Sequence, residues 1–329
     1  MQIHYYLWQI QAYFVAKRLH QKIEFDIAHH VTFVKYSSPS FLSLLPIPFV
    51  WGSVGGAETA PKTFWQDFNL KNKIYETLRL LVRWIGEQDP FTRLTARRNA
   101  ITYTTTKDTA KRVTQLGASC VKIASETALS KSEINYLAQL PPPNTNPFRF
   151  VSIARLLHWK GMYLGLKAFA KANLFNAEYW IVGDGPEMKK LQKIAQDLAI
   201  SNSVKFWGKL PRDEVLLKLG QCSALVHPSL HDSGGWVCLE AMAARRPVIC
   251  LNLGGPAEQV TSETGFQVSA DNPDQCINDM AEVMKELVKD KKLLLQMGKS
   301  GQKRVMELYN WEVKGKEFAQ IYQQLGCSK

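Results

Sequence analysis

The sequence lacks the patterns that mark metal-binding, secreted and membrane-spanning proteins. Its six cysteines form no CxxC pair or other metal-ligand spacing. Three of them, Cys222, Cys238 and Cys250, fall in apolar runs, which predicts buried, reduced thiols. The longest apolar run is interrupted by Pro46 and Pro48 and is too short to cross a bilayer. Because the first residues also have no basic region and no cleavage site typical of a signal peptide, the sequence predicts a cytoplasmic protein.

Other absences exclude functional classes. No strand runs into a GxGxxG loop and a helix, which argues against the alternative of a dinucleotide-binding oxidoreductase. No nucleic-acid motif and no dense block of basic residues occur, so the sequence predicts no nucleic-acid partner. Neither a catalytic triad nor a glycosidase-like pair of carboxylates can be placed.

What the sequence does have is a diffuse excess of positive charge. The net charge is +12, with 17 Lys and Arg against 10 Asp and Glu in residues 1–147, and 24 against 19 in residues 148–329. Such an excess favours an anionic membrane surface or an anionic small substrate, and an effect on solubility alone is the other interpretation. The length of 329 residues, 46% of them hydrophobic, predicts about two domains with real cores.

Residues 148–273 alternate between short apolar runs and amphipathic segments, and helical patterns follow. This alternation predicts a parallel sheet with crossover helices. The proline-rich run at residues 140–147 suits neither a helix nor a central strand, which predicts a linker between domains. We therefore expect an N-terminal domain over residues 1–147 and a C-terminal domain over residues 148–310.

The first half is less regular. Residues 5–22 predict an amphipathic helix with aromatic side chains and a basic C-terminal end. Residues 25–33 are strand-like and contain the pair His29 and His30. Two further strand patterns follow: the first runs into a glycine turn, and the second, within residues 99–117, is followed by a helix.

The strongest functional pattern lies within residues 227–249. Asp232 stands eight positions before Glu240, and Gly234 and Gly235 lie between them. The glycines allow a tight turn that exposes backbone N–H groups at a helix N-terminus, where phosphate binds. The carboxylates, one before the helix and one about two turns inside it, accept hydrogen bonds from hydroxyl groups. The pattern indicates a ligand such as a nucleotide-sugar; the alternative is a plain loop–helix junction with a capping Asp and a solvent-facing Glu.

Arg155 and Lys160 form a second pattern, five positions apart between a strand and a helix. Ligands of parallel sheets collect at such loops. Two cations there can hold a diphosphate and stabilise negative charge as it develops, Arg as a fork and Lys as a point charge. The alternative is a pair of surface cations.

Gly183, Asp184 and Gly185 form a third pattern, at a strand end before a helix that is predicted to begin at Pro186. Taken alone, the same residues are typical of any tight turn between a strand and a helix. Residues 254–258 repeat the arrangement of strand, glycines and helix, and we interpret them as structural.

Together these patterns resemble the retaining glycosyltransferases of family 4, which have the GT-B fold. The resemblance covers roughly residues 23–325 and is strongest over residues 148–270. Two acidic residues with seven residues between them, a Leu-Glu-Ala-Met-Ala helix and a Pro-Val-Ile strand are typical of the family. This chain has Asp232 in place of the first Glu, Ala154 in place of a Gly, and Arg245 where a Gly is usual. We interpret the last change as a harmless surface cation.

The resemblance implies two Rossmann-like domains facing a cleft, with a last helix over residues 311–329 crossing back to the first domain. It also implies transfer of a hexose from a nucleoside-diphosphate sugar to a hydroxyl acceptor, with retention at the anomeric carbon. Arg155 and Lys160 would stabilise the departing diphosphate. Glu240 would bind the ribose hydroxyls, and Asp232 would contact the sugar.

The resemblance extends to the surroundings of the donor. The loop with Gly183, Asp184 and Gly185 would border the nucleotide base and the donor pocket. Family members often have a His that contacts the donor sugar; His30 takes that place by a one-residue shift, or the role is lost. The glycine-rich loop that ends at Glu58 is a weaker candidate for the acceptor side.

No Asp-x-Asp motif occurs in the chain. Metal-dependent sugar transferases use that motif to hold a divalent ion on the diphosphate. We therefore expect no metal and no cofactor here, since Arg155, Lys160 and helix N-termini would neutralise the diphosphate.

Family members usually open with a strand and a glycine-rich loop, and nothing of that kind precedes Tyr5. The first domain therefore looks N-terminally shortened, and we expect the chain to bind nucleotide but to turn over poorly. The alternative function is an inactive nucleotide-sugar-binding remnant or scaffold. The aromatic face of Tyr5, Leu7, Trp8 and Phe14 would favour self-association or peripheral binding to the inner face of the membrane, unless the fold covers it.

Overall fold

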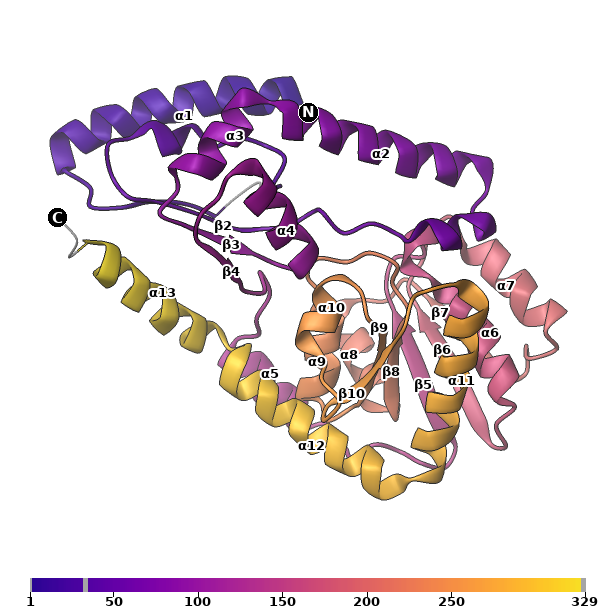
Figure 1. The fold of residues 1–329 in the computed structure, drawn as a ribbon. Helices are drawn as coiled ribbons and strands as arrows, with labels where there is room; N and C mark the ends of the chain where they lie inside the picture. The colour runs from indigo at the N-terminus through magenta and orange to yellow at the C-terminus, as the bar shows by residue number, and fades with distance from the viewer. Residues whose placement is uncertain (1, 32–34, 327–329) are drawn as a thin grey trace. The chain divides into compact units, whose positions relative to one another are not determined.

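Residues 2–31 and 35–326 are described by a computed structural model (Figure 1). By packing, the chain divides into two units. The first holds the chain up to Glu58, then Leu70–Glu126, and again from Gly315 onward. The second holds Thr59–Asn69 and Thr127–Lys314.

The sequence placed a domain boundary at residue 147, whereas packing divides the chain between residues 126 and 127. Leu129, Leu137 and Leu140 lie buried in a core cluster of the second unit, which explains why the residues before the proline-rich run group with it. A buried apolar side chain stabilises a fold by roughly 1.5–3 kcal/mol, so three of them attach this segment firmly.

The second unit is built on a six-stranded parallel sheet with the strand order β10-β9-β8-β5-β6-β7. Its strands are β5 Phe148–Ile153, β6 Ala177–Val182, β7 Val204–Gly208, β8 Ala224–His227, β9 Val248–Leu251 and β10 Gly265–Val268. Every residue of β8 and β9 is buried, as expected for strands with both faces covered. The predicted parallel sheet with crossover helices is confirmed.

Helices connect or flank these strands and cover both faces of the sheet. They are α5 Lys131–Ala138, α6 Met162–Ala172, α7 Met188–Asp197, α8 Arg212–Gly220, α9 Trp236–Ala243, α10 Gly254–Gln259, α11 Pro273–Lys289 and α12 Lys291–Leu308, with the short 3₁₀ helices η2 Lys62–Asp67 and η3 His158–Lys160. The helix predicted to begin at Pro186 begins two residues later, because the turn continues through Glu187.

The order of the strands places the functional end of this sheet. From β5, the chain first adds β6 and β7 on one side and then returns to add β8, β9 and β10 on the other. Adjacent loops therefore leave in opposite directions at the carboxyl ends of β5 and β8. Ligands of open parallel sheets bind at such a switch point.

The first unit is a smaller α/β unit with a four-stranded parallel sheet, in the order β1-β2-β3-β4. Its elements are α1 Gln2–Ile23, β1 Ala28–His30, η1 Phe41–Leu44, β2 Phe49–Val54, α2 Leu70–Gln88, α3 Pro90–Arg98, β3 Ile101–Thr104, α4 Lys107–Leu116 and β4 Val121–Ile123. The predicted strand over residues 25–33 is reduced to β1, and the end of that prediction, residues 32–33, lies outside the described residues.

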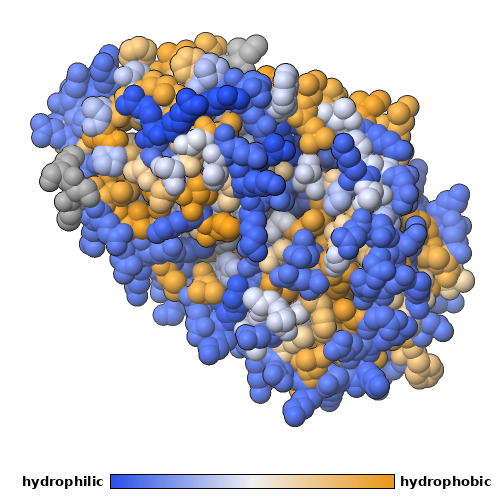
Figure 2. All heavy atoms as spheres, in the orientation of Figure 1, coloured by the Kyte–Doolittle hydropathy of each residue, from blue (hydrophilic) through white to orange (hydrophobic). Residues whose placement is uncertain are grey.

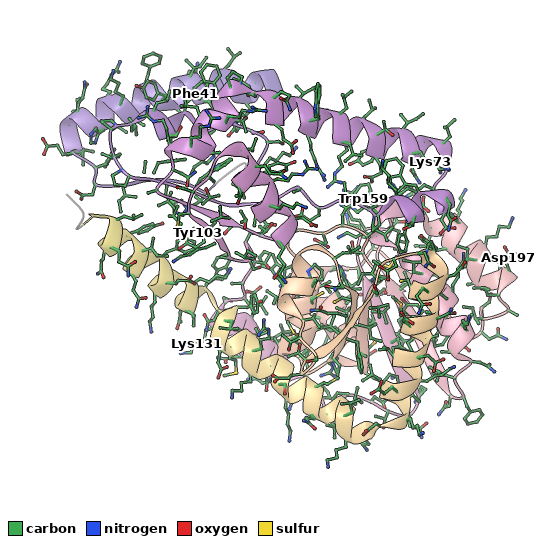
Figure 3. All side chains as sticks on the ribbon, in the orientation of Figure 1. Phe41, Lys73, Tyr103, Lys131, Trp159 and Asp197 are labelled. Carbon is green, nitrogen blue, oxygen red and sulfur yellow. The ribbon has the colours of Figure 1, made fainter. Side chains whose placement is uncertain are left out.

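Helix α13 (Trp311–Gly326) packs on this smaller sheet through its second half. The ring of Phe318 lies 5.1 Å from that of Tyr103, which Figure 3 labels, and Ile321 joins Val50 and Tyr103 in one core cluster. His29 also holds the helix, because its Nδ1 lies 2.6 Å from the Tyr322 hydroxyl and its Nε2 2.7 Å from the Gly52 carbonyl oxygen. Burial lowers the pKa of His29, which favours the neutral ring in this contact.

The interpretation of Arg245 as a surface cation is wrong. Its side chain is half-buried, and its guanidinium donates hydrogen bonds to the carbonyl oxygens of Ala138 (3.1 Å) and Leu140 (2.8 Å). The neighbouring Arg246 is fully buried and donates to the Pro141 carbonyl oxygen at 2.6 Å. Both arginines supply donors to a segment whose prolines have none, so they fix the proline-rich run to the second unit.

Two other expectations concern the cysteines and membrane-spanning helices. Cys222, Cys238 and Cys250 are buried free thiols, as predicted. None of the helices in the described residues is long and apolar enough to cross a membrane.

Candidate functional site

The predicted site loops follow four neighbouring strands of the second unit. They leave the carboxyl ends of β9, β8, β5 and β6, which are adjacent in the sheet. In a parallel sheet these ends lie at one edge, so loops from distant parts of the sequence meet there. The switch point between β5 and β8 is the centre of this edge.

Lys160 and Asp232 meet across the switch point. Lys160 ends η3 after β5, Asp232 lies in the loop after β8, and the Lys160 Nζ is 2.5 Å from the Asp232 Oδ2. Both side chains remain partly exposed, at 19% and 18%. His227, the last residue of β8, adds a third group, with its Nε2 3.2 Å from the same oxygen. The result is a compact, water-accessible cluster of opposite charges.

These neighbours fix the charge of Asp232. Burial opposes ionisation of the carboxyl group, but His227 and Lys160 outweigh it and hold the pKa of Asp232 well below its usual range. The other carboxylate oxygen, Oδ1, accepts hydrogen bonds from the N–H groups of Gly234 and Gly235, both at 3.3 Å. A charged acceptor thus sits at the start of α9, where the helix dipole favours it.

This arrangement corrects the expectation for the two glycine N–H groups. We expected Gly234 and Gly235 to present them to a phosphate, and the structure directs them to the Asp232 carboxylate instead. The alternative of a capping Asp does not hold either, because the N-cap of α9 is Gly235, without a side-chain cap, and Asp232 binds N–H groups of the turn before the helix. Gly235 has a φ of 57°, a left-handed conformation that a side chain disfavours, so the glycine is needed for the turn itself.

Glu240 has a different partner. It is the fifth residue of α9, little more than one turn inside the helix instead of two, and it is buried, not solvent-facing. The Arg212 guanidinium lies 2.7 Å from its Oε1 and also contacts Glu133 at 2.9 Å. Burial raises the pKa of Glu240, and the charge of Arg212 offsets that effect only in part. Arg212 therefore bridges two carboxylates at the start of α8.

Arg155 is exposed, and none of the described residues forms a side-chain hydrogen bond or ion pair with its guanidinium. Its loop is nevertheless fixed. The Leu156 N–H donates to the Asp184 carbonyl oxygen (2.9 Å), and the Glu187 N–H donates to the Leu156 carbonyl oxygen (3.1 Å). The loops after β5 and β6 are thus joined by main-chain hydrogen bonds, and Arg155 projects from a well-defined position.

The glycines after β6 allow the loops that follow β5 and β6 to lie close together. A Cβ on Gly183, which has a φ of 135°, would lie 1.9 Å from the Ala154 carbonyl oxygen. A Cβ on Gly185 would lie 2.5 Å from the Leu156 carbonyl oxygen. The side chain of Asp184 is exposed and accepts a hydrogen bond from the Gly185 N–H at 2.7 Å. Tight packing of the two loops accounts for both glycines, and the Asp184 side chain stays accessible.

The predicted residues of the first half lie in the first unit. His30 ends β1 and is buried. Glu58, the weaker acceptor-side candidate, is also buried and accepts hydrogen bonds from the Thr106 hydroxyl (2.7 Å), the Thr109 hydroxyl (3.0 Å) and the Gly56 N–H (3.0 Å). These bonds tie a loop to the start of α4, so the Glu58 carboxylate has a structural role.

The sequence analysis missed three contributors to the site. His227 was detectable, because a polar residue that ends an apolar strand lies at the functional edge of a parallel sheet. Arg212 gave no signal, since it begins an ordinary helix far from Glu240 in sequence. Thr127 was also hidden; its hydroxyl donates to the Gly234 carbonyl oxygen at 2.9 Å and so holds the glycine turn.

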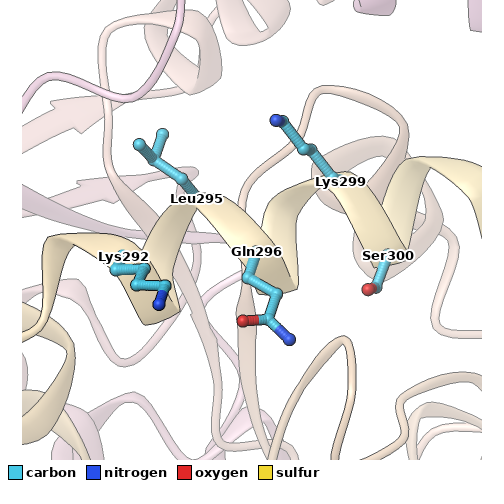
Figure 4. Close-up of a pocket in the computed structure, with 5 residues that line it drawn as sticks. All are labelled: Lys292, Leu295, Gln296, Lys299 and Ser300. Atoms are coloured by element: carbon cyan, nitrogen blue, oxygen red, sulfur yellow. The ribbon is translucent and has the colours of Figure 1, made fainter.

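Two further features carry no part of the site. The hollow in Figure 4 is lined by residues of α12 alone: Lys292, Leu295, Gln296, Lys299 and Ser300. It is an open groove on one helix and contains none of the predicted site residues. Within residues 2–31 and 35–326, no three or more His, Cys, Asp and Glu side chains are grouped as they are around a metal ion.

Residues 138–304, about half of the chain, match the family described as glycosyl transferases group 1. Glycogen synthase of Mycobacterium tuberculosis is 26% identical over 183 residues, which cover 55% of this chain and 43% of that protein. The match thus spans less than half of the relative's length.

Solved structures resemble the fold over most of the chain. Sucrose-phosphate synthase from Thermosynechococcus elongatus has a TM-score of 0.63 at 17% identity, covering 96% of this chain and 78% of the other. HepE from Anabaena, solved with UDP and glucose, has a TM-score of 0.62 at 19% identity, covering 94% and 81%. These neighbours are GT-B glycosyltransferases, so the two units have the Rossmann-like folds of that class.

Proposed function

The chain belongs to the glycosyl transferases group 1, and on that premise we propose that it transfers a hexose from a nucleoside-diphosphate sugar to a hydroxyl acceptor with retention at the anomeric carbon. The observation that carries this proposal is the contact of Lys160 with Asp232 at the switch point of the sheet. A cation for the diphosphate and a carboxylate for sugar hydroxyls stand side by side there, both accessible to a ligand.

The role of Lys160 follows from its partners. Its ammonium group has three donors, and Asp232 uses one of them. The remaining donors can reach a phosphate oxygen while the carboxylate keeps the side chain in place. Arg155, which is exposed on a fixed loop, adds a planar fork suited to the second phosphate.

The two carboxylates would bind different parts of the donor. Asp232, held ionised by its neighbours, accepts hydrogen bonds from sugar hydroxyls. Glu240, kept in place by Arg212, would bind the ribose hydroxyls, and Arg212 supplies the opposite charge that such a buried carboxylate needs. The loop from Gly183 to Gly185 would border the base, with the exposed Asp184 side chain as its polar group.

In the proposed reaction the acceptor oxygen bonds to the anomeric carbon on the face from which the diphosphate leaves. The bond between that carbon and the phosphate oxygen breaks, and this oxygen takes the proton of the acceptor hydroxyl. Negative charge builds on the diphosphate during the step, so Arg155 and Lys160 stabilise the transition state more than the ground state. No divalent ion is needed in this scheme, since the two cations neutralise the diphosphate.

The remaining parts of the proposal concern the first unit. His30 would contact the donor sugar from the acceptor side. The acceptor is a hydroxyl group of a glycan, a lipid-linked saccharide or a small molecule, and the protein would work at the cytoplasmic face of a membrane. The excess positive charge of the chain supports an anionic surface of this kind.

A thermal-shift screen with UDP, GDP and ADP and their hexose conjugates tests the donor class. We expect one nucleotide series to raise the melting temperature of the protein and to lose this effect in Lys160→Ala. Lys193→Ala, an exposed lysine of α7, is the matched control and should respond like the unchanged protein.

Proton NMR of the product then reads the anomeric configuration. No shift with any nucleotide, or equal shifts in Lys160→Ala, would overturn the proposed donor site. Inversion at the anomeric carbon would overturn the proposed stereochemistry alone. Binding without turnover would instead identify a nucleotide-sugar-binding remnant.

A further inference from the structure

Helix α2 turns its apolar side to solvent. Eight large hydrophobic side chains of this helix are exposed and form one continuous strip, which we call the outer face: Leu70, Ile74, Tyr75, Leu78, Leu81, Val82, Trp84 and Ile85. Leu78, Leu81 and Ile85 are 55%, 48% and 51% exposed. In Figure 2 the hydrophobic colour gathers along the edge where α2 lies. Such a contiguous apolar patch is unusual on a soluble protein and marks a site of interaction with another molecule or a membrane.

The opposite side of α2 is polar, and its contacts fix the orientation of the helix. The Arg83 guanidinium is buried and donates to the Ala57 carbonyl oxygen at 2.9 Å. Glu87 accepts a hydrogen bond from the Tyr36 hydroxyl at 2.6 Å. A Cβ on Gly86 would lie 2.2 Å from the Ser37 carbonyl oxygen, so the helix approaches the chain closely there. Rotating α2 to bury the outer face would break all of these contacts.

Helix α1, in the same unit (Figure 1), also exposes apolar side chains and has basic residues. Its exposed residues include Leu7, Phe14 and Val15, and its charged residues are Lys17, Arg18 and Lys22 with no Asp or Glu over its whole length. In α2 the two carboxylates, Glu76 and Glu87, lie on the inward side and not on the outer face. Helix α3 likewise contains three arginines and no carboxylate.

We propose that the outer face of α2, together with the exposed side of α1, docks in the plane of an anionic lipid bilayer. Apolar side chains would enter the boundary between headgroups and acyl chains, and the flanking lysines and arginines would meet anionic headgroups. Helix α2 is 19 residues long, so it presents a strip of roughly 28 Å. The surface lies in the first unit and contains none of the residues assigned to the donor.

The positive charge of the first unit favours an anionic bilayer over a second copy of the chain as the partner of the outer face. The first unit carries 17 Lys and Arg against 9 Asp and Glu, so it holds most of the net charge of the protein. A two-fold dimer through α2 would bring the same cationic helices together and would be opposed by their repulsion. An anionic bilayer can bury the apolar strip and also bind the cations.

Vesicle flotation of the full chain tests the docking surface. The probe is a vesicle of phosphatidylcholine with about one third phosphatidylglycerol, compared with pure phosphatidylcholine. The triple variant Leu78→Glu, Leu81→Glu and Ile85→Glu should lower the partition coefficient by about 100-fold or more, because each residue loses a buried apolar side chain. The matched control changes three exposed apolar residues of the second unit, Phe175→Glu, Leu217→Glu and Met306→Glu, and should bind as before.

A second variant, Lys17→Gln, Arg18→Gln and Lys22→Gln, separates charge from apolar contact. We expect this variant to bind the anionic vesicles about 10-fold more weakly or less tightly still. Most of the salt dependence of vesicle binding should also be lost. Circular dichroism should show both variants folded, since every changed residue is exposed.

Three outcomes would overturn the inference. They are failure of the unchanged protein to bind the anionic vesicles, equal binding by the α2 variant, and equal binding to pure phosphatidylcholine. A stable dimer in sedimentation that dissociates in the α2 variant, without lipid binding, would assign the outer face to a second copy instead. The inference rests on the proposed place of work at a membrane; because nucleotide binding is read separately, failure here would overturn that place and leave the proposed transfer reaction intact.

Discussion

Helices α2 and α11 have similar lengths and the same amphipathic pattern, and they are oriented in opposite ways. Helix α11 buries Ile277, Met280 and Met284 in the core and directs its charged residues outward. Helix α2 buries Glu76 and Arg83 and exposes three of its four leucines. The 3.6-residue period thus determines that a helix forms with two unlike faces, but the partners of each face decide which one is buried.

Charged groups in the two units differ in the same way. In the second unit Lys160 and Asp232 form an ion pair that solvent still reaches. In the first unit the charged side of α2 is enclosed, and Arg83 contacts main-chain carbonyl oxygens. Enclosed charges of this kind fix architecture, whereas accessible pairs can exchange a partner for a ligand. Five predictions test these contrasts.

The largest expected effect is on stability. Met280→Glu places a charge in the core of α11 and should destabilise the protein by roughly 3–5 kcal/mol, or prevent folding. Leu81→Glu makes the same chemical change on the outer face of α2 and should alter stability by less than about 0.5 kcal/mol. Urea denaturation measures both, and equal destabilisation would show that the outer face of α2 is in fact buried.

The next effect is on donor binding. Arg155→Ala combined with Lys160→Ala should weaken the affinity for the preferred nucleoside diphosphate by about 100-fold or more, because charged hydrogen bonds to phosphate are lost. Isothermal titration calorimetry reads the affinity, and vesicle binding should stay unchanged. If the double variant keeps its affinity, the two cations do not hold the diphosphate.

Glu240→Gln should weaken binding of the nucleoside diphosphate as well as of the nucleotide-sugar. The ribose belongs to both ligands, and a hydrogen bond to a charged group contributes roughly 1.5–3 kcal/mol. Titration with the free nucleoside diphosphate separates the ribose from the sugar. An unaltered affinity would assign Glu240 to packing with Arg212 alone.

A smaller effect concerns the pH dependence of stability. The folded pKa of Asp232 lies below its ordinary value, so its contribution is complete above about pH 4 and declines as the pH falls toward the folded pKa. Asp232→Asn should therefore cost about 1–2 kcal/mol at pH 7 and progressively less below pH 4. Denaturation at pH 7, 5 and 3 checks the trend, and a constant difference would contradict it.

The smallest expected effect is that of a chelator. Turnover should be unchanged in excess EDTA, because Arg155 and Lys160 neutralise the diphosphate in the proposed mechanism. A coupled assay for released nucleoside diphosphate measures it. Loss of turnover that magnesium or manganese restores would show that a divalent ion shares this task.

The positions of the loops after β6 and β8 could be predicted well because their signals are local. Strand, glycine turn and helix follow one another directly at Gly183 and again at Gly235, and parallel topology brings such turns to one edge. The pairing of Arg212 with Glu240 could not be predicted. The two residues are far apart in sequence, and only the fold sets their distance.

The sequence by itself determined the alternation of strands and helices, the two α/β units and the loops that carry Arg155, Lys160 and Asp232. These follow from periodicity and from glycine and proline positions, which act over a few residues. Only the tertiary structure decided that Glu240 pairs with Arg212, that Arg245 is half-buried, and that α2 faces outward with its apolar side. Each of these depends on which distant groups arrive to bury or pair a side chain, and that is a property of packing.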